Sequence, residues 1–200
     1  MKRAQPGFTL LELMVVLAIA GVLFAVGIPA MGNFIRNSRI TGAANDVMAA
    51  LHFTRSEAIK RRLPVTLCTS ASLVTDVNPT CANSAFLTGW IAFVDTNQSG
   101  QRDAGEAVLL QHEAMNVQIT ARSSVTPFRV TYLLNGFALN PNAARLVLCD
   151  ERGNVATGGE LSSARGILVS VTGRAGVTRD KNEIQTLINA IGQPIGGCAP

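Results

Sequence analysis

Glu12 is the residue whose type and position place the strongest chemical demand on this chain. It lies near the start of an apolar run that begins at Phe8, and no charged residue follows it between Leu13 and Ile35. Taking a carboxylate into hydrocarbon costs at least a few kcal/mol, so such a residue needs a partner of opposite charge. Cleavage between Gly7 and Phe8 would create an α-amino group at the same end of the helix. The two charges could then cancel between neighbouring copies.

The order of features at the N-terminus differs from that of a secretory signal peptide, whose cleavage site follows its apolar stretch. Here Lys2 and Arg3 precede Gly7, and Gly7 precedes the apolar stretch, so cleavage would leave the hydrophobic segment on the mature protein. The run G-F-T-L-L-E-L (7–13) resembles the class III leader of type IV pilins and type II secretion pseudopilins. In those families a membrane prepilin peptidase cuts the leader and N-methylates the new terminus. The alternative is an ordinary signal anchor with Glu12 at the membrane interface.

A second candidate site is the polar segment 95–106, whose spacing matches the ligand pattern of an EF-hand calcium loop. The ligand positions are Asp95, Asn97, Ser99, Asp103 and Glu106, with Gly100 at the sharp turn. The flanking runs W-I-A-F-V and A-V-L-L are typical of strands, however, whereas an EF-hand loop lies between helices. The same residue types form tight polar turns without a metal. Calcium site and plain turn both stay open, and no other cofactor is expected.

The chain contains four cysteines, Cys68, Cys81, Cys149 and Cys198. In an exported domain they indicate two disulfides, because the periplasm is oxidising. Three connectivities are possible, and local pairing is the simplest, which favours Cys68 with Cys81 and Cys149 with Cys198. A zinc site is the alternative, but the sequence has no C-x-x-C pair, and only the two histidines could add ligands.

Composition and motifs exclude several classes of function. The chain has 200 residues and a mass of 21.1 kDa, enough for one globular domain and an anchor. Its formal charge of +4 includes Lys2 and Arg3, so the same count without the leader is about +2, and nucleic-acid binding would need a local cluster. There is no Walker loop, G-x-S-x-G elbow or H-E-x-x-H pair. His52 and His112 lie in no motif that pairs a base with a nucleophile, so no enzyme activity is expected.

The N-terminal third of the chain is predicted to be helical in two parts. The uncharged stretch Leu13 to Ile35 holds 23 residues, and ~1.5 Å of rise for each gives roughly 35 Å, sufficient to cross a bilayer core. Pro29 removes a backbone hydrogen bond and should kink or loosen the helix. Further on, apolar residues recur at helical spacing, which predicts an amphipathic helix that packs on a sheet and ends at Pro64. The apolar stripe is Ile40, Ala44, Val47, Leu51 and Ala58, and the charged residues expected elsewhere are Arg39, Asp46, Arg55 and Glu57.

From residue 65 onward, short β-rich runs alternate with turn residues, which predicts an α+β fold with antiparallel sheet. We expect seven strands, at 65–68, 90–95, 107–112, 117–121, 130–134, 145–149 and 166–171. A capping-box start at Asp180 and Glu183 predicts a short helix closed by Gly192. The expected organisation is a leader (1–7), a transmembrane helix (8–35), an amphipathic helix (36–63) and a β-rich globular domain (64–200).

Five motifs together resemble the GspH/FimT group of minor pilins and minor pseudopilins. They are T-R-S-E-A-I-K-R (54–61), V-T-L-C (65–68), G-W-I-A-F-V-D-T-N (89–97), L-C-D (148–150) and V-T-G-R (171–174). The resemblance implies a type IV pilin-like fold, in which two β-sheets pack on a long N-terminal helix. It also implies a non-enzymatic, single-pass protein of the inner membrane with a periplasmic domain.

The partners that this resemblance implies are the prepilin peptidase and other major and minor pilins. The favoured role is a minor pilin, similar to FimT and FimU, that helps to prime or cap a type IV pilus. The alternatives are a GspH-like pseudopilin of type II secretion and a pilus-associated DNA receptor of natural transformation.

A DNA-binding motif of FimT-type proteins is only partly present. Those proteins carry a C-terminal G-R-x-R motif whose arginines contact the phosphate backbone, and the matching stretch here, G-R-A-G (173–176), keeps Arg174 and lacks the second arginine. Arg179 and Lys181 follow, and Arg165 precedes, so a small basic patch around a hairpin tip is expected. The alternative is a β-turn with solvated charges.

Overall fold

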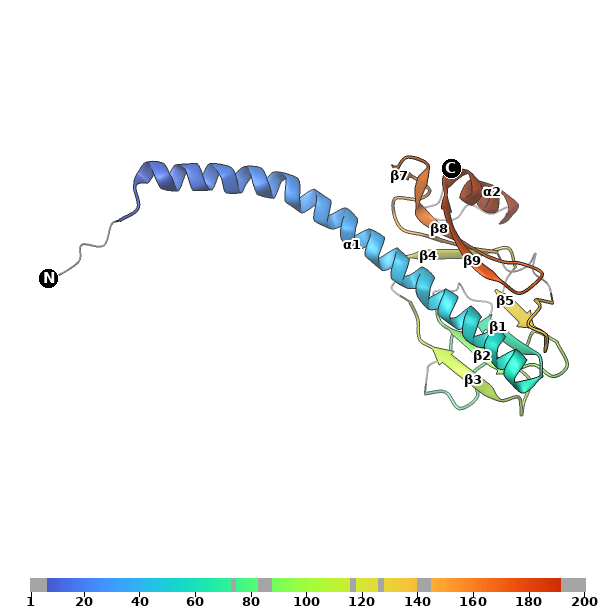
Figure 1. Cartoon of the computed structure of the whole chain (residues 1–200). Coiled ribbons are helices and arrows are strands. Elements are labelled where there is room, and N and C mark those ends of the chain that lie inside the picture. The colour runs from blue at the N-terminus through green and yellow to red at the C-terminus, as the bar shows by residue number, and fades with distance from the viewer. Residues whose placement is uncertain are drawn as a thin grey trace. The chain divides into compact units, whose positions relative to one another are not determined.

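A computed structural model describes residues 7–72, 75–82, 88–115, 118–125, 128–139 and 145–191 (Figure 1). The chain divides into two compact units, Met1–Ser38 and Arg39–Pro200. Helix α1, Leu10–Arg61, contributes residues to both units. The two helical segments expected at 8–35 and 36–63 are therefore one helix. The helix continues across Pro29, so this proline does not divide it into two elements.

The second half of α1 buries the apolar stripe that the sequence predicts. Ile40, Val47, Leu51 and Ala58 are fully buried, and Ala44 is nearly so. Residues three and four apart share one face of a helix, so this stripe packs as a unit into the core. The helix ends where expected: Arg62 adopts a left-handed φ of 55°, and Pro64 follows.

Glu57 corrects the prediction that all charged residues of α1 lie away from the core. Its side chain is buried and accepts hydrogen bonds from Arg61 Nε at 2.6 Å and Lys60 Nζ at 3.5 Å. The hydrogen bond from Arg61 lowers the pKa of the Glu57 carboxyl, although burial acts in the opposite direction. Part of the basic triplet at the end of α1 is therefore neutralised locally.

The strands form two antiparallel sheets, which confirms the α+β prediction. The first sheet has the order β3 (Val108–His112), β2 (Trp90–Val94), β1 (Val65–Thr69), β5 (Arg129–Tyr132). The second has the order β4 (Thr120–Ser123), β6 (Arg145–Cys149), β8 (Leu161–Val169), β7 (Ala156–Gly158), and β9 (Ala175–Asp180) also pairs with β8. Helix α2, Lys181–Ile191, follows β9.

Two strands, β7 and β9, were not predicted, and β8 starts at Leu161 instead of Gly166. The segment L-S-S-A-R at the start of β8 and the segment A-G-V-T-R-D of β9 lack the apolar alternation that marks a half-buried strand. They are strands because β8 pairs with neighbours on both sides. Residues 116–117, where the fourth strand was expected to begin, lie outside the described part.

One main core forms between α1 and one face of each sheet. Trp90 and Tyr132 of the first sheet and Leu146 and Ile167 of the second join the α1 stripe in this cluster. A smaller cluster covers the other face of the second sheet, where α2 buries Ile184, Leu187 and Ile188. The predicted cap of α2 is present, because Glu183 N donates to Asp180 Oδ1 at 2.8 Å.

Gly173 provides a test of the packing between the hairpin 170–174 and the loop 133–139. Its φ is +76°, and an added Cβ would lie 1.9 Å from the carbonyl oxygen of Gly136. We expect Gly173→Ala to lower the free energy of unfolding by about 3 kcal/mol or more, since neither backbone can yield easily. The measurement is the urea midpoint of the full chain in detergent.

The matched control is Gly176→Ala in β9, where no atom lies within 4 Å of the added Cβ. It should change the free energy of unfolding by no more than about 0.5 kcal/mol. Equal midpoints for the two variants would contradict the close approach at Gly173.

Candidate functional site

The Gly7–Phe8 bond lies just before the start of α1. Gly7, Phe8 and Thr9 are non-helical and exposed. Glu12 N donates to Thr9 Oγ1 at 3.2 Å, and Leu13 N donates to Thr9 O at 3.2 Å, so Thr9 caps the helix. The bond predicted for cleavage is therefore accessible, and Glu12 lies in the first helical turn, where the helix dipole favours a negative charge. Residues 1–6 of the predicted leader lie outside the described part.

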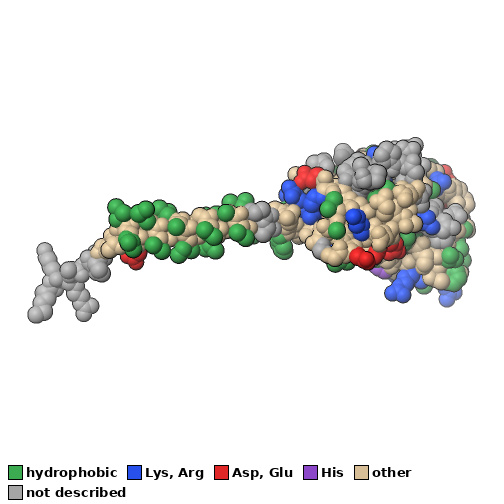
Figure 2. Space-filling model, turned by 90° about the horizontal axis from the view of Figure 1, so that it is seen from above, with side chains coloured by type: hydrophobic (Ala, Val, Ile, Leu, Met, Phe, Trp, Pro, Cys, Tyr) green, Lys and Arg blue, Asp and Glu red, His purple; other side chains and the backbone are tan. Residues whose placement is uncertain are grey.

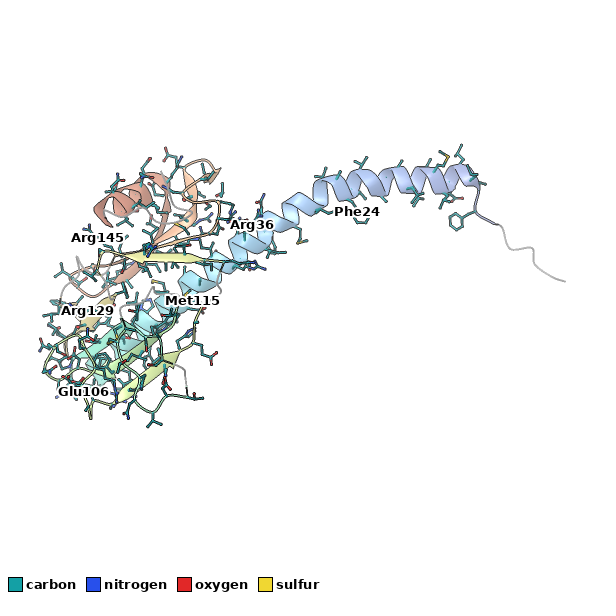
Figure 3. The ribbon with its side chains drawn as sticks, turned by 180° about the vertical axis from the view of Figure 1, so that it is seen from behind. Phe24, Arg36, Glu106, Met115, Arg129 and Arg145 are labelled. Carbon is teal, nitrogen blue, oxygen red and sulfur yellow. A yellow bond between two sulfur atoms is a disulfide. The ribbon has the colours of Figure 1, made fainter. Side chains whose placement is uncertain are left out.

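The first half of α1 exposes large apolar side chains at successive positions along its length, and hydrophobic atoms cover much of the face seen in Figure 2. Phe24, labelled in Figure 3, is 65% exposed, and the other large apolar side chains from Phe8 to Ile35 are at least 42% exposed. By length and composition, α1 is able to cross a membrane. A helix that is apolar on every face requires a lipid or protein environment.

Cys68 and Cys81 form a disulfide, as the sequence predicts, with a Cα–Cα distance of 5.7 Å. Cys149 is also disulfide-bonded, and Cys198, its predicted partner, lies outside the described residues. Cys68 packs with Ile91 and Phe93 on the face of the first sheet that points away from the main core. The disulfide therefore fastens the segment around Cys81 over this face.

The turn 95–106 between β2 and β3 uses its polar side chains for internal hydrogen bonds. Asp95 is fully buried; its Oδ1 accepts from Ser99 N at 3.0 Å, and its Oδ2 accepts from Gly100 N at 2.9 Å and Thr66 Oγ1 at 2.6 Å. Asn97 Nδ2 donates to Asp103 Oδ2 at 2.8 Å. The buried carboxylate therefore points toward donors of its own protein, as in a hydrogen-bonded turn.

Glu106, labelled in Figure 3, also accepts backbone donors instead of converging on Asp95. Its Oε1 accepts from Thr96 N and its Oε2 from Asp103 N, each at 3.0 Å. Within the described ranges, no group of three or more histidine, cysteine or acidic side chains is arranged to hold a metal. The calcium site and the plain turn remain the two alternatives for this loop, and they are tested below.

The basic residues predicted around one hairpin tip do not lie together. Arg174 is exposed in the hairpin 170–174, where Ser170 N donates to Arg174 O at 2.9 Å and Arg174 N donates to Ser170 Oγ at 3.1 Å. Arg179 is exposed near the other end of β9, five residues or roughly 17 Å further along the strand. Lys181 is exposed at the start of α2. Arg174 therefore stands apart from the other two.

Arg165 corrects the prediction of a surface cation, because its side chain is only 4% exposed. Its Nη1 donates to the carbonyl oxygens of Ser162, Ser163 and Ala164 at 2.9–3.2 Å, and its Nη2 donates to Thr41 Oγ1 of α1 at 3.1 Å. Burial, followed by repulsion from Arg179 and Arg152, lowers the pKa of Arg165 to about 10. It remains charged at neutral pH and connects β8 to α1.

Arg55 is a structural residue that sequence reasoning missed. From α1 its Nε donates to Gly136 O at 3.0 Å, and its Nη2 donates to Thr172 O at 2.9 Å. These bonds fix the loop 133–139 and the hairpin 170–174 to one helical turn. The acceptors lie 81 and 117 residues further along the chain, so no local pattern could reveal them.

The two histidines lie in separate environments. The His112 ring stacks on Trp90 with ring centroids 3.9 Å apart and an interplanar angle of 8°. His52 is exposed on α1. His112 lies at the end of β3, an edge strand of the first sheet, far along the chain from His52.

Comparison with known proteins identifies the family. A model of the type II transport protein GspH matches residues 43–173, and a model of the prokaryotic N-terminal methylation motif matches residues 2–28. The chain belongs to the GspH family. Members of this family are structural proteins of the pilin type, and the methylation motif at residues 2–28 fits processing by the prepilin peptidase.

Sequence relatives match a short part of the chain. The type IV major alpha-pilin of Moraxella bovis is 37% identical over 62 residues, which cover 31% of this chain and 39% of that protein. A fimbrial protein of Pseudomonas aeruginosa is 45% identical over 47 residues, 24% of this chain and 30% of that protein. The chain thus matches less than half of the length of these relatives.

Two crystal structures of the type IV minor pilin FimU of Pseudomonas aeruginosa have a similar fold. One is 21% identical with a TM-score of 0.48, covering 69% of this chain and 91% of that chain. The other is 23% identical with a TM-score of 0.49, covering 72% and 92%. The family assignment rests on the family model and not on these two structures.

Asp95 tests whether the turn 95–106 is held by hydrogen bonds or by an ion. We expect Asp95→Ala to lower the free energy of unfolding by about 3 kcal/mol, because it leaves buried donors unpaired. Asp103→Ala, the matched control at an exposed position of the same turn, should cost less than about 1 kcal/mol. Both values come from urea unfolding of the full chain in detergent.

Calcium is tested on the same variants. Because the Asp95 carboxylate already accepts three protein donors, we expect millimolar calcium or a chelator to leave the thermal midpoint of the wild-type chain unchanged. A rise in the midpoint with calcium that both substitutions abolish would instead assign an ion site to this loop.

Proposed function

We propose that this protein is a minor pilin that helps to start or cap a type IV pilus. The observation that carries the proposal is that a single helix, α1, has two halves with different surroundings. The first half of α1 carries the accessible Gly7–Phe8 bond, Glu12 and an apolar surface on every side. The second half is built into a GspH-type unit of two sheets.

The physical argument for filament assembly concerns the charge of Glu12. In an apolar assembly its carboxylate is stabilised by the new α-amino group of a neighbouring subunit, once the leader has been removed. A subunit that keeps its leader lacks that amine. Processing therefore couples membrane insertion to assembly, and the role requires no catalysis by this chain.

A deletion strain complemented with the full chain tests the role. Loss of surface pili and twitching, restored by the gene, is the expected result. Normal piliation with loss of protein secretion would replace the proposal with the type II secretion alternative, a role consistent with the name of the matching family model.

Glu12→Ala should be inserted and processed normally but enter filaments about tenfold less efficiently or worse, because the partner amine is left unpaired in an apolar environment. Intact mass of the membrane-extracted protein should show an N-methylated Phe8 as first residue in both wild type and variant. Immunoblots of sheared filaments measure incorporation.

Asp46→Ala, which removes an exposed carboxylate from the second half of α1, is the control and should be incorporated like wild type. Retention of residues 1–7 in a strain with an active peptidase would contradict the assignment.

A DNA receptor is the second candidate, supported by the exposure of Arg174 on a hydrogen-bonded hairpin. Arg174→Ala should weaken retardation of duplex DNA by the detergent-solubilised full chain and reduce the salt slope by about one, the effect of one lost phosphate contact. The control is Arg122→Ala, at an exposed arginine of β4. Equal retardation by wild type and both variants would remove Arg174 as a phosphate contact.

A further inference from the structure

The end of the globular unit at the last turn of α1 exposes a group of large apolar side chains. We call this surface the distal pole; it consists of Ile59, Leu63, Leu134, Phe137 and Val171, which are 41–65% exposed. Hydrophobic side chains are visible at the right-hand end of the globular unit in Figure 2. A group of exposed apolar side chains of this kind marks a surface that binds protein or lipid.

The segments that carry the distal pole are bonded to one another. From α1, Arg55 donates to the carbonyl oxygens of Gly136 and Thr172 at 3.0 and 2.9 Å. An added Cβ on Gly136 would lie 2.8 Å from Ile59 Cδ1, so the loop that carries Leu134 and Phe137 lies directly against the helix. The pole is therefore a preformed surface, which loses little entropy when it binds.

The distal pole is also basic. The three segments that form it, 55–63, 133–139 and 170–174, contain five cations and one carboxylate. They are Arg55, Lys60, Arg61, Arg62 and Arg174, with Glu57 as the carboxylate. Glu57 is bound by Lys60 and Arg61, and among the described residues no carboxylate pairs with the exposed Arg62 or Arg174. The apolar group thus has a basic edge.

The turn 95–106 brings acidic residues to the same end of the unit, because Asp95 N donates to Pro64 O at 2.9 Å. Asp95 is buried, and Asp103 and Glu106 accept hydrogen bonds from donors of their own turn. The turn also contains Arg102. The pole and the turn together carry six cations and four carboxylates, so this end of the unit remains net positive.

We propose that the distal pole binds the surface of an anionic lipid bilayer. The apolar side chains enter the boundary between headgroups and acyl chains, while Arg62 and Arg174 contact lipid phosphates, as in proteins that bind at a membrane interface. An anionic bilayer matches both parts of the pole, since it offers apolar atoms and negative charge in one surface. Duplex DNA offers the phosphates alone.

The bilayer bound by the distal pole is a second one. Ile59 lies 24 residues after Ile35, the last residue of the uncharged run, and that length of helix spans roughly 36 Å. The bilayer that holds the first half of α1 is therefore out of reach of the pole along this helix. The inference goes beyond the proposed role in a pilus and does not depend on it, because its test uses no filament.

The test uses the full chain in nanodiscs of neutral phosphatidylcholine, so that the first half of α1 is already in lipid. Flotation with phosphatidylglycerol vesicles should recover these nanodiscs at least about fivefold better than flotation with phosphatidylcholine vesicles, because cations near an anionic surface strengthen binding. Nanodiscs without protein give the background. Equal recovery with the two kinds of vesicle would overturn the proposal, and recovery with neither would assign the pole to a protein partner instead.

A charge introduced into the pole gives a second measurement. Phe137→Glu should reduce recovery by about tenfold or more, because a carboxylate cannot enter the apolar layer and repels anionic lipid. The matched control is Val177→Glu on β9, at a side chain that is 43% exposed outside the pole; it adds the same charge and should leave recovery unchanged. Equal recovery of the two variants contradicts binding through the pole. Non-reducing peptide mapping of Cys68–Cys81 confirms that each variant is folded.

Fluorescence separates insertion from attraction by charge alone. The chain has one tryptophan, Trp90, which is buried. Phe137→Trp adds a second one in the pole, and vesicles of brominated phosphatidylglycerol should quench its emission and shift it to shorter wavelength. Val177→Trp, the control, should show neither change. Flotation without quenching of the Phe137→Trp variant would mean adsorption without insertion and would overturn the proposal.

Discussion

Burial of the apolar stripe of α1 is the interaction on which the rest of the globular unit depends. The two sheets present one face each to the same cluster, and residues from Ile40 to Ala58 contribute the helical side of that core. Because sheets of four and five strands cannot bury both faces by themselves, each requires an additional layer. The helix supplies it for both sheets at once, and Arg165 and Arg55 then fix the second sheet along the helix at Thr41 and Thr172.

The same helix meets two different environments along its length. In the second half, the buried residues are mainly apolar and most exposed positions are polar, as expected for a helix that covers a core in water. In the first half, apolar residues cover every face and Glu12 is the one charge before Arg36 within 10–35. A continuous helix therefore joins the globular unit to a segment that needs lipid or other helices, which suits the proposed role of a subunit that moves from membrane to filament.

The sequence predicted correctly those elements whose formation depends on residues close together in the chain. Helical periodicity gave the α1 stripe, apolar runs gave β1, β2, β3, β5 and β6, and short sequence separation gave the disulfide between Cys68 and Cys81. The failures depend on distant partners. From its sequence context Arg165 was expected at the surface, because its partner Thr41 lies 124 residues away. Arg55 was expected to be solvated, because the carbonyl groups that it binds belong to distant loops. Strand β9 is largely polar, and it forms a strand because its backbone pairs with β8.

The turn 95–106 shows why a ligand pattern alone does not establish a metal site. Oxygen-rich side chains at EF-hand spacing can point inward to an ion or toward the donors of their own backbone, and both arrangements need the same residues. In this structure the Asp95 carboxylate points toward donors of its own protein. Asp95 directly follows β2 and is buried, and Thr66 Oγ1 of β1 bonds both Asp95 and Thr131 of β5. The Asp95 carboxylate therefore belongs to a network that joins the turn to two strands of the sheet. The Asp95 side chain, bonded to Thr66 of the sheet, also accepts from Ser99 N and Gly100 N and so positions the turn.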